Sequence, residues 1–293
     1  MLAFAVVWLF AALSDEWGDF GLAAWSAAVA VALGAAAFLA QRAGESVLAG
    51  LLALSAVIGV AFFVGALEDW FGWLDDFGDS PFGGFRVAVL LLALVLLAAS
   101  LLALWRFRFP LLVVVAAASA WFFVTDLLSG GGDWSAIVTV AVGLIFLAIA
   151  FALDRTPDTR PYAFWVHVAA GVTIGGGLLW FFHEGDLRLL LLGAAGLAYI
   201  ALGDRLLRSS WVVLGAWGLL QTTAHFATKW GGENEFFFPI FYFVPFFLFT
   251  GGFELDGTPG RPWLGALIFG LYALVLMAIG VFLAHRRRAL PAP

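Results

Sequence analysis

Long apolar runs without a charged residue constrain this chain more than any other feature. Most contain about twenty residues, which is what a helix needs to cross roughly 30 Å of hydrocarbon. Membrane-spanning strands are excluded because transmembrane barrels show short alternating segments instead. The pattern therefore predicts an all-α, polytopic membrane bundle built from tandem helical hairpins. The runs are Met1–Ser14, Gly21–Ala40, Ser46–Leu67, Val87–Trp105, Phe109–Thr125, Trp134–Leu153, Pro161–His183, Leu189–Gly203, Ser209–Thr228, Phe236–Phe253 and Pro262–His285.

Composition supports this class of protein and excludes several others. The 293 residues are 64% hydrophobic and only 12% charged, which no soluble core can accommodate. Cysteine is absent, so disulfides and thiolate metal sites are excluded. No segment is both basic and aromatic enough to indicate nucleic-acid binding. No linker or low-complexity tail divides the sequence, and we predict a single transmembrane domain over residues 1–293 whose first partner is the lipid bilayer.

Two runs differ from the others. Met1–Ser14 is short, but it lacks the preceding positive charge of a signal peptide, so we interpret it as a span. Phe236–Phe253 contains Pro239 and Pro245, each of which removes a helix hydrogen bond. A straight crossing is therefore not expected there, and we predict a Phe/Pro-rich re-entrant or interfacial segment at 236–253.

The distribution of charge predicts the topology. If Phe236–Phe253 does not cross, the inner side holds ten cations and four acids, and the outer side holds four cations and sixteen acids. This is the segregation that the positive-inside rule describes. It predicts about ten transmembrane helices in a prokaryotic plasma (inner) membrane, with both termini cytoplasmic.

Polar residues at membrane depth are the candidates for function because they are costly in lipid. Asp126 and His225 each follow an inner arginine by seventeen or eighteen residues, so both are expected near the outer interface. In Ser209–Thr228, a polar and aromatic stripe repeats every four residues, at Trp217, Gln221 and His225. A stripe of this kind on a helix surrounded by lipid is expected to face the bundle interior.

These positions predict an outward-facing pocket that binds a proton, a cation or a small polar solute, with histidines suited to titration near neutrality. Its ligand-binding residues would be Asp126, His225, Gln221, His183 and Trp121. The alternative is structural: Asp126 hydrogen-bonds at a helix end and His225 meets headgroups and water. No metal-site, cofactor or catalytic motif occurs, so we predict neither a metal nor a cofactor, and a protein that is not an enzyme.

An acidic segment, 68–76 followed by Asp79, is the densest charge in the chain. It is expected on the outer side, after the run that ends at Leu67. Such a segment either collects cations or forms a solvated loop that enforces orientation.

Several short motifs resemble an uncharacterised group of bacterial polytopic membrane proteins, known only as a domain of unknown function. The resemblance extends from about Arg42 to the C-terminus and implies the same multi-pass architecture, with no assigned reaction. Its motifs are Arg108-Phe109-Pro110 with Trp121 and Asp126, Tyr162-Ala163-Phe164-Trp165 with Gly171, Gly215 and Gly218 with His225, and Phe237-Phe238-Pro239.

Two functions follow from these observations. The first is a transporter or channel-like protein that binds a small solute or ion in the outward pocket, between the fifth, seventh and ninth runs. The second is a non-catalytic scaffold or accessory subunit of a larger membrane complex. In that case a membrane protein partner would dock on 236–253, because so many phenylalanines exceed what membrane anchoring requires.

Overall fold

The computed structural model describes residues 2–73, 84–129, 132–182, 185–206, 208–231 and 262–289. Helices make up nearly all of this part of the chain, and it contains no strand. The chain divides into two compact units, Met1–Thr173 and Ile174–Pro293, and each is described by itself. The single domain over 1–293 stays a prediction.

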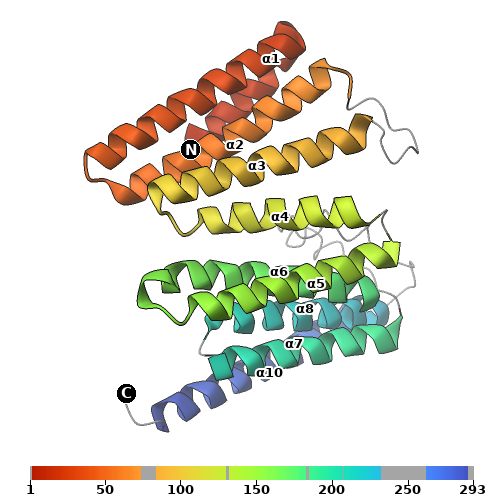
Figure 1. Ribbon diagram of the computed structural model, residues 1–293. Coiled ribbons are helices and arrows are strands. Elements are labelled where there is room, and N and C mark those ends of the chain that lie inside the picture. Colours follow the sequence, from red (N-terminus) through yellow and green to blue (C-terminus); the bar gives the residue numbers. More distant parts are fainter. Residues whose placement is uncertain are drawn as a thin grey trace. The chain divides into compact units, whose positions relative to one another are not determined.

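The first unit is a row of helical hairpins, in which each helix from α1 to α5 contacts the next (Figure 1). Successive helices run in opposite directions because the connections between them are short. The helices are α1 (Leu2–Arg42), α2 (Ser46–Trp70), α3 (Gly84–Phe107), α4 (Leu112–Leu128) and α5 (Gly132–Leu153), followed by the short 3₁₀ helix η1 (Pro157–Thr159) and α6 (Arg160–Phe182). The boundary between the two units falls within α6.

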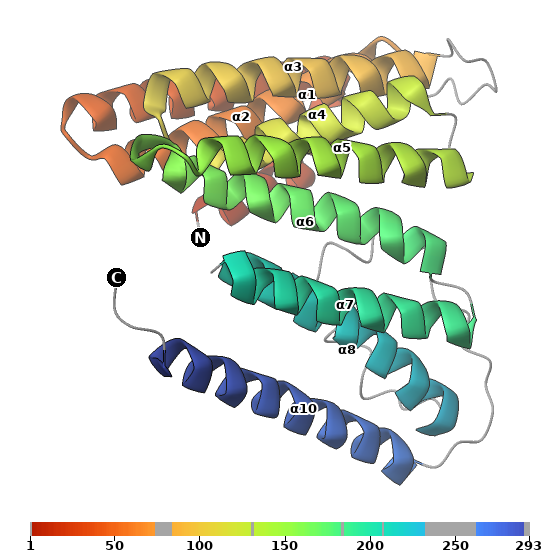
Figure 2. The same ribbon diagram turned by 60° about the horizontal axis from the view of Figure 1, so that its bottom comes forward.

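Beyond the end of α6, the described residues of the second unit form a tight hairpin and one further helix. The hairpin consists of α7 (Asp186–Leu206) and α8 (Ser209–Gly231), and α10 (Pro262–Ala289) lies alongside α8 (Figures 1 and 2). The hydroxyl of Tyr272 on α10 donates a hydrogen bond to the carbonyl oxygen of Ala216 on α8, at 2.8 Å. Through this contact α10 is attached to the middle of α8.

Six of the described helices are long and apolar enough to cross a membrane, which confirms the multi-pass helical bundle. They are Phe20–Arg42, Ser46–Trp70, Arg86–Phe107, Gly132–Leu153, Pro157–Phe182 and Asp186–Leu206. Leu112–Leu128 is apolar but shorter, and α8 carries several polar residues. The number of ten crossings stays a prediction, and the segment 236–253 lies outside the described residues.

Helix α1 covers both of the first two predicted runs. At Gly18 its backbone is not helical, with φ 62° and ψ 171°, so two helices meet there at a kink. Glycine reaches this positive φ without the steric cost that a Cβ would impose. The kink lies between Ser14 and Gly21, where the sequence predicts the end of one run and the start of the next.

Small residues form the helix contacts in both units. An added Cβ on Gly59 of α2 would lie 3.1 Å from the Cα of Ala30 on α1. An added Cβ on Gly196 of α7 would lie 2.7 Å from the carbonyl oxygen of Gly215 on α8. Close approach of backbones at small residues is how helices associate where lipid removes the hydrophobic driving force. Many large apolar side chains are instead exposed, as on a surface that faces lipid.

Candidate functional site

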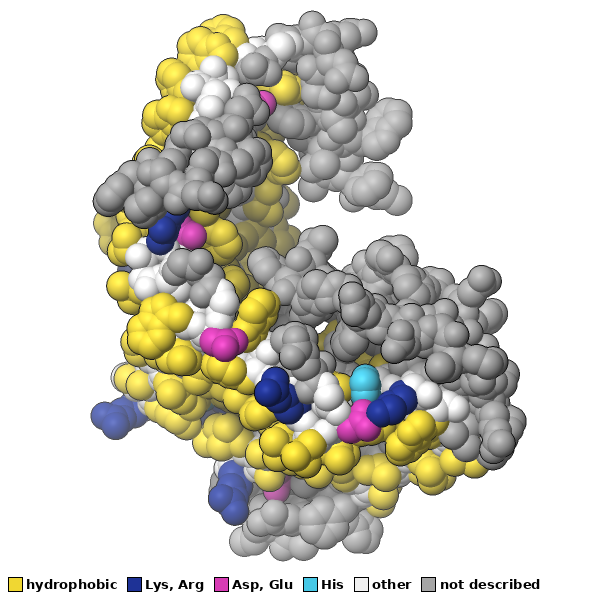
Figure 3. Space-filling view, turned by 90° about the vertical axis from the view of Figure 1, so that its right-hand side faces the viewer, with side chains coloured by type: hydrophobic (Ala, Val, Ile, Leu, Met, Phe, Trp, Pro, Cys, Tyr) yellow, Lys and Arg dark blue, Asp and Glu magenta, His cyan; other side chains and the backbone are white. Residues whose placement is uncertain are grey.

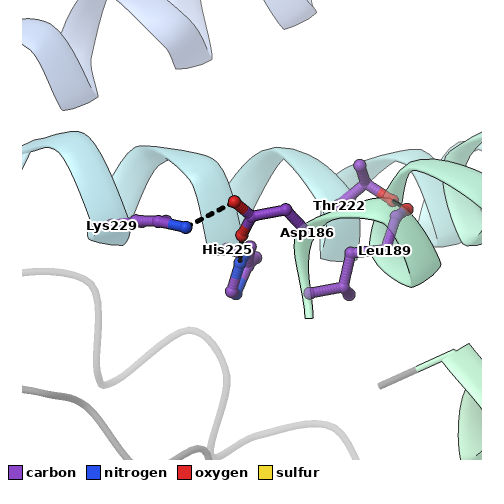
Figure 4. Close-up of polar contacts among 5 residues, drawn as sticks. All are labelled: Asp186, Leu189, Thr222, His225 and Lys229. Atoms are coloured by element: carbon purple, nitrogen blue, oxygen red, sulfur yellow. Dashed lines mark hydrogen bonds and ion pairs between the residues drawn. The ribbon is translucent and has the colours of Figure 1, made fainter. Parts of the chain in front are cut away.

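A cluster of charged side chains joins the first turn of α7 to the last turns of α8 (Figure 4). The carboxylate of Asp186 accepts a hydrogen bond from the ammonium of Lys229 through one oxygen. Its other oxygen lies 3.3 Å from Nε2 of His225. About half of the Asp186 and Lys229 side chains is exposed, whereas the His225 side chain is 24% exposed. The three groups therefore form one hydrogen-bonded set at the open end of the α7–α8 hairpin, opposite its turn.

The direction of the two helices explains this arrangement. Because α7 and α8 are antiparallel, the N-terminus of α7 lies beside the C-terminus of α8. A carboxylate is stabilised at a helix N-terminus and an ammonium at a helix C-terminus. Asp186 is the first residue of α7, and Lys229 is two residues from the end of α8. His225 precedes Lys229 by one helical turn, which places it on the same face.

The polar stripe of α8 continues from this cluster into the hairpin. Gln221, one turn before His225, is 4% exposed. One turn further, the indole nitrogen of Trp217 is buried and has no hydrogen-bond partner among the described residues. The predicted stripe of Trp217, Gln221 and His225 thus leads from half-exposed charge to buried polar groups. The buried end of the stripe therefore has an indole N–H donor, that of Trp217, to which no described residue bonds.

Thr222 lies beside the stripe and joins the two helices. Its hydroxyl donates to the carbonyl oxygen of Leu189 on α7 at 2.9 Å (Figure 4). An added Cβ on Gly193 would lie 3.1 Å from this hydroxyl oxygen, so the glycine leaves the space that Thr222 occupies. The polar face of α8 is therefore held against α7 by both a hydrogen bond and a close contact.

The surface of this end of the second unit shows the cluster directly. In Figure 3 a histidine side chain touches one acidic and one basic side chain, and apolar side chains lie along one side of this group. Of the histidines with described side chains, His167 is fully buried and the side chain of His225 is 24% exposed.

Asp126 and Trp121 belong to the first unit, where other partners engage them. The guanidinium of Arg86 on α3 donates to the carbonyl oxygen of Asp126 at 2.6 Å, and its Nε lies 3.7 Å from the Asp126 carboxylate. The indole of Trp121 donates to the hydroxyl of Thr139 on α5 at 3.1 Å. These contacts are what the structural alternative requires of Asp126, since a cation at the end of α4 satisfies its last carbonyls.

The predicted residues are therefore divided between the two units. Gln221 and His225 share one face of α8, Asp126 and Trp121 lie on α4, and His183 lies outside the described residues. The approach of Asp126 to His225 stays a prediction. Among the described residues, no group of three or more His, Asp or Glu side chains is arranged to hold a metal ion.

Sequence reasoning missed Asp186 and Lys229. The predicted runs begin at Leu189 and end at Thr228, so both residues fell outside them, yet both are helical. The signal that was missed is a pair of charges at helix ends. Asp186 is an acid in the first turn of α7, and Lys229 is a base one turn beyond His225 in α8.

The sequence also did not indicate a second histidine contact, in the first unit. His167 on α6 is fully buried, and its Nε2 lies 2.9 Å from the carboxylate of Asp154, which directly follows α5. The Asp154 side chain is 26% exposed, so this pair joins the interior to the surface. The ring of Phe151 meets that of His167 edge to face, with centroids 5.4 Å apart. Asp154 and His167 are thirteen residues apart across a turn, and no periodic pattern relates them.

Comparison of the chain with models of known families, with curated proteins and with solved structures finds no match in any of the three. The resemblance to the uncharacterised bacterial group accordingly stays a prediction.

Proposed function

We propose that this protein is a transporter or channel-like protein that binds a small solute or ion, and that the polar stripe of α8 lines its site. The supporting observation is the continuity of that stripe with the charged cluster at the end of the hairpin. Lys229 and Asp186 present charge to solvent beside His225, and Gln221 one turn further along α8 is polar and buried. Ionisable and polar groups in this arrangement are typical of ion and proton pathways.

The roles of the residues differ in this proposal. Asp186 attracts cations to this end of the hairpin, where its carboxylate also contacts Lys229 and His225. Gln221 then offers both a donor and an acceptor to a solute that leaves water. Asp126 is proposed to contribute from α4, as the sequence predicts.

Flux measurements in liposomes test this function. The purified protein is reconstituted with a pH-sensitive dye inside, and acid pulses and rubidium uptake are followed. We expect flux above that of empty liposomes, and loss of this flux in His225→Ala and Gln221→Ala. Thr223→Ala is the matched control, because Thr223 is on α8 but bonds only to the carbonyl oxygen of Leu219 in its own helix.

Two outcomes would contradict the proposal. One is a wild-type protein that moves neither protons nor rubidium, and the other is full flux in both α8 variants. Asp126→Ala tests the contribution of α4 separately. If this variant leaves the flux unchanged, the site is limited to the second unit.

We also propose the finer topology, with ten crossings, both termini cytoplasmic and a prokaryotic inner membrane as the location. Its support is the charge segregation along the sequence. Single cysteines in this cysteine-free chain make the test direct. A cysteine placed after Arg288 should react with an impermeant maleimide only when cells are opened, and one placed at Asp76 should react in intact cells. The reverse result would overturn the topology.

A further inference from the structure

Two arginines at one end of the first unit lie against the same aromatic ring. Arg42 is the last residue of α1 and Arg106 is the penultimate residue of α3, and these two helix ends lie side by side (Figures 1 and 2). The guanidinium carbon of Arg42 lies 4.4 Å from the centroid of the Phe38 ring, and that of Arg106 lies 5.0 Å from it. Aromatic faces attract such cations. The two positive charges are therefore neighbours at one point of the surface.

A second residue of α1 holds Arg106 in place. The guanidinium of Arg106 donates a hydrogen bond to the side-chain oxygen of Gln41, and the side-chain amide of Gln41 donates to the carbonyl oxygen of Arg106 at 3.3 Å. This reciprocal pair joins the ends of α1 and α3. A guanidinium has five N–H donors, so most of those on the exposed Arg106 side chain stay available to a ligand.

In the part of the chain that the structure describes, no carboxylate forms an ion pair with Arg42 or Arg106. Glu45, three residues after Arg42, is exposed, and its side chain makes no capping hydrogen bond at the start of α2. The helix dipole explains an arginine at each C-terminus, but it does not require the two to share a ring. Neighbouring like charges repel each other, and more strongly where lipid lowers the dielectric constant. An anion bound by both arginines would offset this repulsion.

The surface beside the two arginines is apolar, as the acyl chains of a lipid require. Leu102 precedes Arg106 by one helical turn and Leu39 precedes Arg42 by three residues, so each lies on about the same face as its arginine. Leu39 is 64% exposed and Leu102 is 65% exposed. Trp105 is 76% exposed, and exposed tryptophan is typical of the headgroup level of a bilayer. The candidate membrane spans of α1 and α3 end at or next to the arginines, so charge begins where the apolar surface stops.

We propose that Arg42 and Arg106 bind the phosphate of an anionic phospholipid whose acyl chains lie along Leu39 and Leu102. Guanidinium groups bind phosphate oxygens through pairs of parallel N–H donors. Basic pockets between membrane helices bind anionic lipid headgroups by the same chemistry. The adjoining apolar surface favours a lipid over free phosphate, which would need the charges alone. The site shares no residue with the α8 stripe, so it goes beyond the proposed transport function without depending on it.

Native mass spectrometry of the full-length protein tests this site. The protein is stripped of lipid in a neutral detergent and titrated with phosphatidylglycerol, or with phosphatidylcholine that has the same acyl chains. The fraction of protein with one lipid bound is measured at each concentration. We expect the first phosphatidylglycerol to bind about ten-fold more tightly than the first phosphatidylcholine. Equal affinities would overturn the proposal, and this comparison needs only the wild-type protein.

A pair of double variants assigns the preference to the two arginines. Arg42→Gln combined with Arg106→Gln should bind the two lipids equally. Arg155→Gln combined with Arg160→Gln is the matched control, because it removes the same charge from two exposed arginines between α5 and α6. The control should keep the ten-fold preference. Full preference in the first double variant, or equal loss in both, would overturn the site.

Inorganic phosphate distinguishes the two sources of the anion. The titration with phosphatidylglycerol is repeated in millimolar sodium phosphate and in sodium chloride of the same ionic strength. We expect the same lipid affinity in both, because free phosphate has no acyl chains to contact the apolar surface. Displacement of the lipid by phosphate, but not by chloride, would assign the arginines to a soluble phosphate compound and overturn the lipid as their ligand.

Discussion

The α1–α2 and α7–α8 hairpins use the same packing principle but treat polar groups differently. Both bring helices together at glycine and alanine. In α7–α8, the Thr222 hydroxyl donates to a backbone carbonyl of the other helix, and the Asp186 carboxylate contacts Lys229 and His225. In α1–α2, Glu68 is buried, and its Oε1 has no hydrogen-bond partner in the part of the chain that the structure describes. We therefore expect the buried Glu68 carboxyl to destabilise the α1–α2 hairpin, and the polar contacts of Thr222 and Asp186 to stabilise the α7–α8 hairpin.

The contact between the backbones of α7 and α8 gives the largest expected effect. Gly215→Leu places a side chain against the carbonyl oxygen of Gly196, so the helices must separate. We expect the free energy of unfolding to fall by about 3 kcal/mol or more, at the upper end for overpacked cores. The thermal midpoint in detergent measures this. Gly280→Leu on α10 is the control, because an added Cβ there meets no atom within 4 Å. An equal loss of stability in both variants would contradict the close contact between α7 and α8.

Removal of the buried Glu68 carboxyl should instead raise the free energy of unfolding. Glu68→Met keeps the volume and ends the cost of an unpartnered polar group, so we expect the free energy of unfolding to rise by about 1–3 kcal/mol. Asp69→Asn changes an adjacent exposed acid and should leave the thermal midpoint unchanged. A lower midpoint for Glu68→Met would show that the carboxyl has a stabilising partner and would remove the contrast between the hairpins.

Loss of the interhelical hydrogen bond should be smaller. Thr222→Val keeps the shape but not the hydroxyl, and hydrogen bonds between membrane helices contribute about 0.6 kcal/mol on average. Thr223→Val is matched to it, since the Thr223 hydroxyl donates only within α8. Denaturant unfolding in micelles should show a greater loss for Thr222→Val, and equal losses would mean that the bond to Leu189 adds nothing.

The charged cluster should contribute least to stability. Asp186→Asn removes the partner of Lys229 and His225, but about half of the aspartate side chain is exposed and water screens such pairs. We expect no measurable shift of the thermal midpoint together with reduced proton flux in liposomes. A large loss of stability would instead assign the cluster a structural role and weaken the proposed function.

Several parts of the site were predictable because they depend on helical periodicity. The four-residue spacing of Gln221 and His225 places both on one face of α8 in any helix, and the structure has them there. Pairs such as Asp186 with His225 and Asp154 with His167 were not predictable. They join different helices at their ends, and the rotation of one helix against its neighbour depends on packing that no periodic pattern encodes.

The sequence by itself determined the solvent and the class of fold. Where two thirds of the residues are apolar and charges occur only between long runs, lipid requires helices whose backbone groups bond internally. Tertiary structure alone decided which polar groups have partners. Glu68 lies in an acidic stretch that resembles a solvated loop, yet α2 continues past it to Trp70 and the packing of α2 against other helices buries its side chain. That difference depends on contacts between residues distant in the chain.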